Sequence, residues 1–114
     1  MPAMNVQELL KRYGAGERDF AGADLRGVDL REATLRGIVL RGANLEKANL
    51  GWANLEEADL SGANLKQAKV NATHLRAANL AGADFSEANM KSAGMKDANL
   101  SGATGVANFE NATC

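Results

Sequence analysis

The sequence predicts an all-β solenoid, a four-sided parallel β-helix covered at its N-terminal end by a short capping α-helix. Three observations lead to this prediction: an apolar residue recurs every five positions from Phe20 to Leu100, a glycine recurs every twenty, and the preceding segment has helical apolar spacing. We expect a cap helix and connector over residues 1–17 and the β-helix over residues 18–114, together forming one domain.

The five-residue period fits neither an α-helix nor a straight strand. In a helix successive leucines would be rotated by about 140°, and in a strand they would alternate between faces. The unit reads Ala-(Asp/Asn)-Leu-x-x, so the alanine and the leucine face one way and the residue between them faces the other. The two remaining residues must turn the chain, and repeated turning closes a coil.

The second turn position shows how many units make one coil. A spacing of fifteen residues gives no column of identical residues at this position. A spacing of twenty gives an unbroken column of glycines: Gly22, Gly42, Gly62, Gly82 and Gly102. Four units therefore make a coil with a square cross-section. Glycine suits the third residue of a type II turn, which needs a positive φ. The other three corners carry Lys, Glu, Ala or Trp, so we expect a different turn type there. The Asp and Asn side chains are expected to hydrogen-bond the turns and to form ladders along the stack.

The two ends depart from the repeat. Asn5 and Glu8 form a capping box, and the helix predicted after them ends at Gly14 and Gly16. Its apolar stripe comprises Val6, Leu9, Leu10 and Tyr13. After Leu100 the phase slips by one residue, so that Gly105 takes a central position, and we expect no cap at the lower end.

The apolar residues that recur every five positions from Phe20 to Leu100 make the chain resemble the pentapeptide-repeat proteins, whose fold is a right-handed four-sided β-helix. The segments 8–13 and 16–20 are similar to the N-terminal cap of cyanobacterial-type members. The resemblance implies a small regulatory or scaffold protein without catalysis. Some members mimic DNA and protect gyrase, but this chain has a net charge of only −1 and lacks their long loops and C-terminal dimerisation helix.

The composition argues against several classes of function. The 13 basic and 14 acidic residues give no charged surface for nucleic acid, and Arg26, Arg31, Arg36 and Arg41 form a belt around one coil. One histidine and one cysteine support no catalytic group, metal site or cofactor. No apolar run approaches the roughly 20 residues that span a bilayer, so we expect a cytoplasmic protein without membrane contact.

The fourth side of the coil carries the candidate partner-binding residues. Trp52 and Arg76 are the expected anchors, because exposed Trp and Arg are favoured at protein interfaces. The whole set is Arg36, Trp52, Asn54, Glu56, His74, Arg76 and Lys96. The alternative is that Trp52 covers Ala72 and the stem of Glu32 while Arg36, Glu56 and Arg76 form a solvated ladder of ion pairs.

The lower end is a second candidate, for a homodimer with a two-fold axis. The residues expected to meet a second copy, together with Met90, are Met95, Leu100, Phe109 and Cys114. The predicted function is a non-enzymatic interaction or scaffold module that binds an unidentified protein partner through one side. The alternatives are a DNA-mimic modulator of gyrase or topoisomerase and a structural module without a specific partner.

Overall fold

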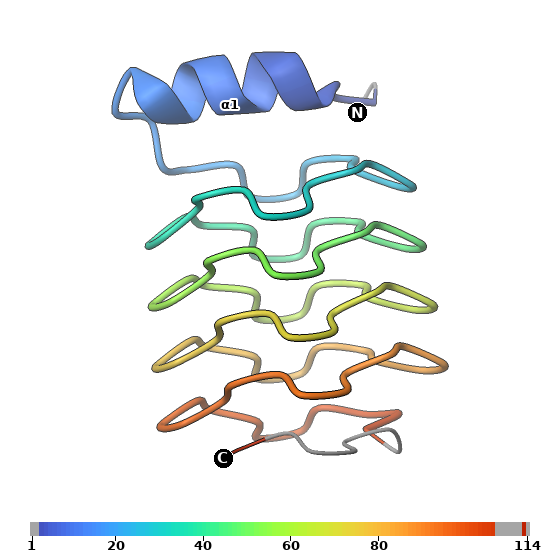
Figure 1. Ribbon diagram of the computed structural model, residues 1–114. Coiled ribbons are helices and arrows are strands. Elements are labelled where there is room, and N and C mark those ends of the chain that lie inside the picture. Colours follow the sequence, from blue (N-terminus) through green and yellow to red (C-terminus); the bar gives the residue numbers. More distant parts are fainter. Residues whose placement is uncertain (1–2, 107–112, 114) are drawn as a thin grey trace.

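The protein is a short stack of square coils with one helix lying across its upper end (Figure 1). The structure is a computed structural model that describes residues 3–106 and 113. Helix α1 spans Val6–Gly14. The overall dimensions are 34 × 22 × 22 Å, so the molecule is a stubby rod.

Each side of the stack is a ladder of parallel single-residue bridges, so the structure contains no longer strands in its described part. Within residues 19–104 every bridge joins residues twenty positions apart, which confirms four five-residue units per coil. On each side, the residues that form these bridges lie one above another in a column, which we call the bridged column of that side. The first side has Asp19, Val39, Asp59, Asn79 and Asn99, and the second has Asp24, Asn44, Asn64, Asp84 and Thr104. The third has Asp29, Asn49, Lys69 and Asn89, and the fourth has Thr34, Asn54, His74, Gly94 and Thr113.

All four corners of the coil use one turn type, which corrects the expectation of two. At each corner the central residue's carbonyl accepts a hydrogen bond from the N–H three positions later, as Leu50 does from Ala53 at 3.0 Å. The second turn residue has a positive φ whether or not it is glycine, as with Trp52 at +62° and Ala72 at +54°. The first turn residue does not, which defines a type II geometry. Ladder pairing on both sides of the corner outweighs the local cost of a left-handed residue.

The Asp and Asn side chains support the corners and only rarely one another. Every Asp and Asn at the bridged position from Asp19 to Asn99 accepts the N–H two residues later through Oδ1. The expected ladder along the stack is seen once in the described part, from Asn64 Nδ2 to Asn44 Oδ1 at 3.5 Å. Asp and Asn alternate in these columns because either side chain supplies the acceptor.

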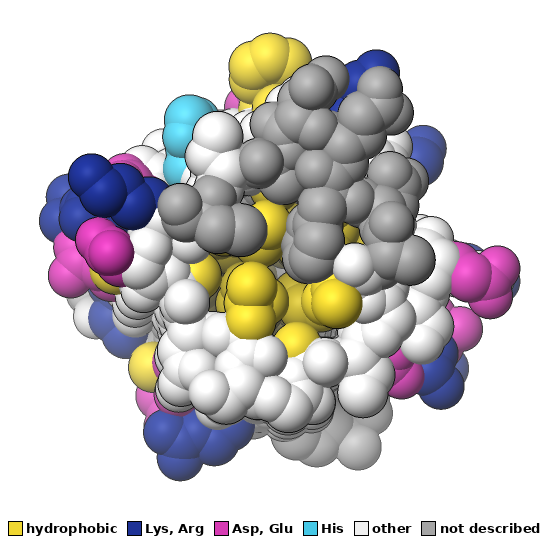
Figure 2. All heavy atoms as spheres, turned by 90° about the horizontal axis from the view of Figure 1, so that it is seen from below, with side chains coloured by type: hydrophobic (Ala, Val, Ile, Leu, Met, Phe, Trp, Pro, Cys, Tyr) yellow, Lys and Arg dark blue, Asp and Glu magenta, His cyan; other side chains and the backbone are white. Residues whose placement is uncertain are grey.

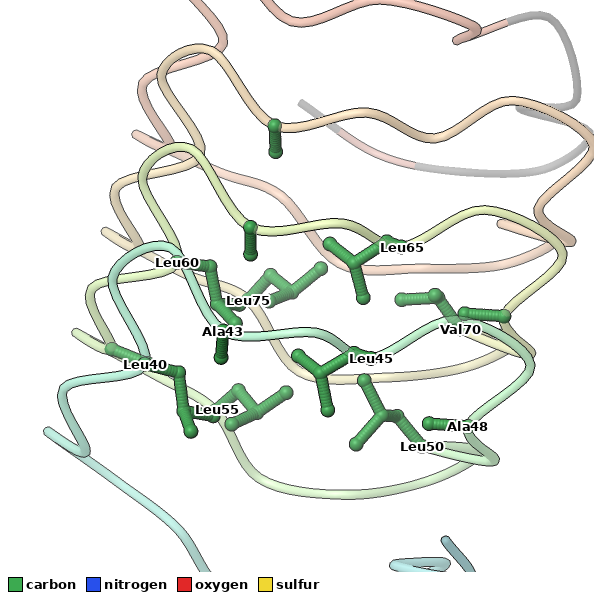
Figure 3. Packing of buried hydrophobic residues seen from close by; sticks show 14 of the residues in the cluster. Leu40, Ala43, Leu45, Ala48, Leu50, Leu55, Leu60, Leu65, Val70 and Leu75 are labelled. Carbon is green, nitrogen blue, oxygen red and sulfur yellow. The ribbon is translucent and has the colours of Figure 1, made fainter. Parts of the chain in front are cut away.

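The core is a narrow column of leucines with small alanines between them (Figure 3). The central residues from Phe20 to Met95 are buried in every coil, with exposures of 3% or less. Leucines from successive coils lie above one another, and the alanines two positions earlier fill the space beside them. One polar side chain, Thr73, is fully buried among the described residues, in a column that also holds Ala33, Ala53 and Ala93.

Helix α1 closes the top of this column. Asn5 Oδ1 accepts the N–H of Glu8 at 2.8 Å, so the predicted capping interaction is present on one side of the box. Leu9 is fully buried on the first coil, but Leu10 is 40% exposed, which corrects its place in the apolar stripe. Tyr13 Oη donates to the Arg36 carbonyl at 2.6 Å and so ties the end of the helix to the fourth side.

The chain before α1 also joins the stack, a contact that the sequence pattern did not predict. Ala3 forms a parallel bridge with Asp24, and Met4 N–H donates to the Asp24 carbonyl at 2.9 Å. This segment therefore supplies one further rung above the second side.

The phase slip after Leu100 is confirmed at the lower end. Thr113 pairs with Gly94, nineteen residues earlier. At Gly105, with φ +71°, an added Cβ would fall within the backbone of Phe85 and Ser86, so this position requires glycine. The expectation of a lower end without a cap concerns residues 107–112 and 114, outside the described residues.

Candidate interaction surface around Trp52

Trp52 stands at the corner between the third and fourth sides, with 61% of its surface exposed. Its backbone is held from the coil below, because Trp52 N–H donates to the Asn71 carbonyl at 3.1 Å. Its turn is also held from within, since Asn49 Oδ1 accepts the Gly51 N–H at 3.0 Å. A large apolar side chain is thus presented to solvent by a rigid corner, which lowers the entropy lost when a partner packs on it.

Thr73 is a supporting residue that the sequence reasoning missed. Its hydroxyl donates to the Leu50 carbonyl at 2.7 Å, the same carbonyl that accepts the turn-closing N–H of Ala53. It therefore braces the Trp52 corner from the next coil. The available signal was a hydroxyl residue in a column of alanines, twenty-one residues after Trp52.

The fourth side gathers the predicted residues next to this corner. His74 lies directly after Asn54 in the bridged column and is exposed. Arg76 Nε donates to Glu56 Oε2 at 2.9 Å, and this hydrogen bond from Arg76 lowers the pKa of Glu56 despite its partial desolvation. Asn54 is occupied in the turn, where its Oδ1 accepts the Glu56 N–H.

The predicted Arg-Glu-Arg ladder is not continuous. The Arg36 guanidinium donates to Glu57, at the corner leaving the fourth side, so Glu56 pairs with Arg76 alone. Arg36 is further tied down because its carbonyl accepts the Tyr13 hydroxyl. Lys96 is exposed and forms no ion pair with any residue that the structure describes. Among the described residues, Lys96 is therefore the more available cation of this side.

The third side carries a groove that the sequence reasoning did not find. It has a volume of about 620 Å³ and is lined by Asp29, Arg31, Glu32, Asn49, Gly51, Trp52, Lys69 and Asn71. Gly51 contributes no side chain to it, whereas the residues above and below in that column, Arg31 and Asn71, both do. A glycine at the first turn position immediately before the Trp was the signal available in the sequence.

The arginine belt is largely neutralised. Arg26 pairs with Asp24, Arg31 with Asp29 and Arg41 with Asp59, each at 2.9 Å. The Arg31 hydrogen bond lowers the pKa of Asp29, as the Arg26 hydrogen bond lowers that of Asp24. Alternating signs leave no continuous charged track on this part of the surface.

At the lower end, hydrophobic side chains occupy the centre and charged ones the rim (Figure 2). Met90 and Met95 are each 1% exposed, which corrects the expectation that they lie open to a second copy. Leu100 is partly buried. Phe109 and Cys114 lie outside the described residues.

Among the described residues, no three His, Cys, Asp or Glu side chains come together in a way that could hold a metal ion. None of the helices that these residues form has both the length and the apolar character needed to cross a bilayer.

The type II corners, the twenty-residue ladders and the leucine column define the class of protein, a right-handed four-sided β-helix. The chain belongs to the pentapeptide-repeat family. The family model, described as pentapeptide repeats, matches in eight copies over residues 19–56, 35–71 and 71–104.

Solved structures of the family are similar to this chain. Rfr23 from the cyanobacterium Cyanothece 51142 is 30% identical with a TM-score of 0.75, over 83% of this chain and 63% of that one. The alr5209 protein from Nostoc PCC 7120 is 39% identical with a TM-score of 0.56, over 90% of this chain and 77% of that one. Both are pentapeptide repeat proteins. No curated protein matches the chain.

Proposed function

We propose that the protein is a non-enzymatic interaction module that binds a protein partner through its fourth side, with Trp52 and Arg76 as anchors. The observation that carries the proposal is the exposure of Trp52 on a corner braced by Thr73 and by backbone ladders. Aromatic and arginine side chains on a preorganised surface are the residues that contribute most to binding.

The neighbouring residues suit a partner of mixed polarity. Arg76 and Lys96 offer positive charge, His74 is exposed, and Glu56 holds Arg76 in place. The surface does not favour mimicry of DNA, which needs continuous negative charge. Cytoplasmic location is part of the proposal, and fractionation of the source cells tests it.

The test is capture of a partner from source cells by the wild type, Trp52→Ala and Arg76→Glu, followed by calorimetry with the purified prey. We expect each substitution to weaken the binding of the partner by at least about tenfold, because each removes an anchor. Lys47→Glu, an equally exposed charge reversal on another corner, should bind like the wild type. Unchanged affinity in both anchor variants, with melting temperatures intact, would rule the fourth side out.

A further inference from the structure

The groove on the third side contains two opposite charges that have no partner of their own. Arg31 and Asp29 satisfy each other through two hydrogen bonds, of 3.0 and 2.9 Å. Glu32 and Lys69 form no ion pair with any residue in the described part of the chain. The groove thus presents one free carboxylate and one free ammonium group.

These two charges lie at opposite ends of the groove along the axis of the rod. Glu32 belongs to the first coil and Lys69 to the third, and the bridges from Asp29 to Asn49 to Lys69 count two rungs between them. Two strand spacings correspond to about 10 Å along the axis. In an extended chain the side chains on one face recur every two residues, about 6.6 Å apart, so positions two and four residues apart on one face bracket this length.

The floor between the charges is polar and open. The carboxamides of Asn49 and Asn71 converge on Gly51, where an added Cβ would lie 3.2 Å from one and 3.3 Å from the other. Asn49 Oδ1 already accepts the Gly51 N–H, so its Nδ2 is left to donate. Within the described residues the Asn71 carboxamide has no hydrogen-bond partner. Such groups match the alternating N–H and C=O of an extended backbone.

The indole of Trp52 forms one wall of the groove and supplies apolar surface beside these amides. We propose that the groove binds an extended segment of the protein partner, in which a basic side chain contacts Glu32 and an acidic one, two or four residues away on the same face, contacts Lys69. This inference rests on the proposed function, because it assigns a segment of that partner to the other flank of Trp52.

The test selects from a displayed library of Trp-free decapeptides on the intact protein. We expect enrichment of sequences with a basic and an acidic residue two or four positions apart, on one face of the extended peptide. Selection on Lys69→Glu should switch the motif to two basic residues at the same spacing. Trp52 is the chain's one tryptophan, so its emission reports occupancy when a selected peptide is titrated.

Three variants locate the peptide. Lys69→Glu should weaken binding of the peptide by about tenfold or more. Gly51→Arg should abolish binding because the new side chain fills the floor of the groove, as Arg31 does one coil above. Lys47→Glu reverses an exposed lysine that does not line the groove and should leave the dissociation constant within about twofold. Lys69→Glu and Lys47→Glu should keep the wild-type melting temperature, whereas Gly51→Arg also requires the Asn49 and Asn71 carboxamides to shift.

Two outcomes overturn the inference. One is a motif that is absent, or that is the same on Lys69→Glu as on the wild type. The other is a Trp52 emission change with neutral oligosaccharides and with none of the peptides, which would make the groove a sugar site. A cellular partner lost by Trp52→Ala and Arg76→Glu but retained by Lys69→Glu and Gly51→Arg would refute the groove while leaving the proposed function intact.

Discussion

At the residue scale, the fold depends on one backbone conformation repeated at every corner. In the described part of the chain, ten residues other than glycine adopt a φ between +54° and +62° there, a region that costs an L-residue about 1–2 kcal/mol. The coil tolerates this because the N–H of seven of them, from Glu32 to Ala77, is held by a carbonyl of the next coil, as Glu57 is by Arg76 at 2.9 Å. The cost remains, however, and it can be measured.

Ala77 and Ala81 form a matched pair for this measurement. Ala77 occupies the second turn position with φ +59°, whereas Ala81 occupies the first and has no positive φ. Ala77→Gly should raise the free energy of unfolding by up to about 1 kcal/mol, because it relieves the strain. Ala81→Gly should lower it by about 0.5–1 kcal/mol through entropy. Urea denaturation checks both, and equal losses would contradict the strain argument.

Thr73 supports Trp52 by one buried hydrogen bond. Thr73→Val keeps the shape and removes the donor to the Leu50 carbonyl, so it should cost about 1 kcal/mol and let the indole move more freely. Fluorescence anisotropy of the single tryptophan measures that motion. Thr73→Ser retains the hydroxyl and should keep the wild-type anisotropy; a fall in that variant too would show that the methyl group, and not the hydrogen bond, holds the corner.

At the element scale, the helix and the coils follow from local patterns, and this is why they could be predicted. The five-residue period and the glycine column specify facing and coil size without any knowledge of distant contacts. The uniform turn could not be read from glycine alone, because ladder hydrogen bonds impose it on Trp52 and Lys47 alike. The groove was missed for a similar reason, since it is lined by residues from three different coils around Gly51.

Helix α1 contains its own control for the role of the cap. Leu9 is fully buried and Leu10 is 40% exposed, although the two are neighbours with the same side chain. Leu9→Ala should cost about 2–5 kcal/mol by opening a cavity above the first coil. Leu10→Ala should change stability by less than about 0.5 kcal/mol. Thermal denaturation distinguishes them, and a similar loss in both would mean that the helix does not seal the core.

At the scale of the whole molecule, carboxylates around the coils make stability depend on acid. Hydrogen bonds from the Ser86 side chain and backbone lower the pKa of Asp84, and those from Arg31 lower that of Asp29. The folded state then binds fewer protons than the unfolded chain, whose aspartates titrate near about 3.9. This contribution is present above that pH and is lost as the pH falls through the folded-state values.

We therefore expect the melting temperature to fall as the pH is lowered from about 5 to about 3, roughly one unit either side of the pKa of an unfolded aspartate. The fall should be smaller in Asp84→Asn than in the wild type. The asparagine keeps Oδ1 as the acceptor for Ser86 and occurs naturally in the same column at Asn44 and Asn64. Identical pH profiles for the two proteins would show that Asp84 does not contribute to this loss.

The ladder spacing of twenty residues has a consequence for how the chain is made. Each coil pairs with the one that precedes it in the sequence, so a coil leaving the ribosome finds its template already exposed and complete. Assembly can then proceed one coil at a time behind a sealed start, with no partner strand still to be translated. Nascent chains arrested at successive twenty-residue lengths should gain protease resistance in equal steps, and a single late jump would indicate that the stack forms all at once.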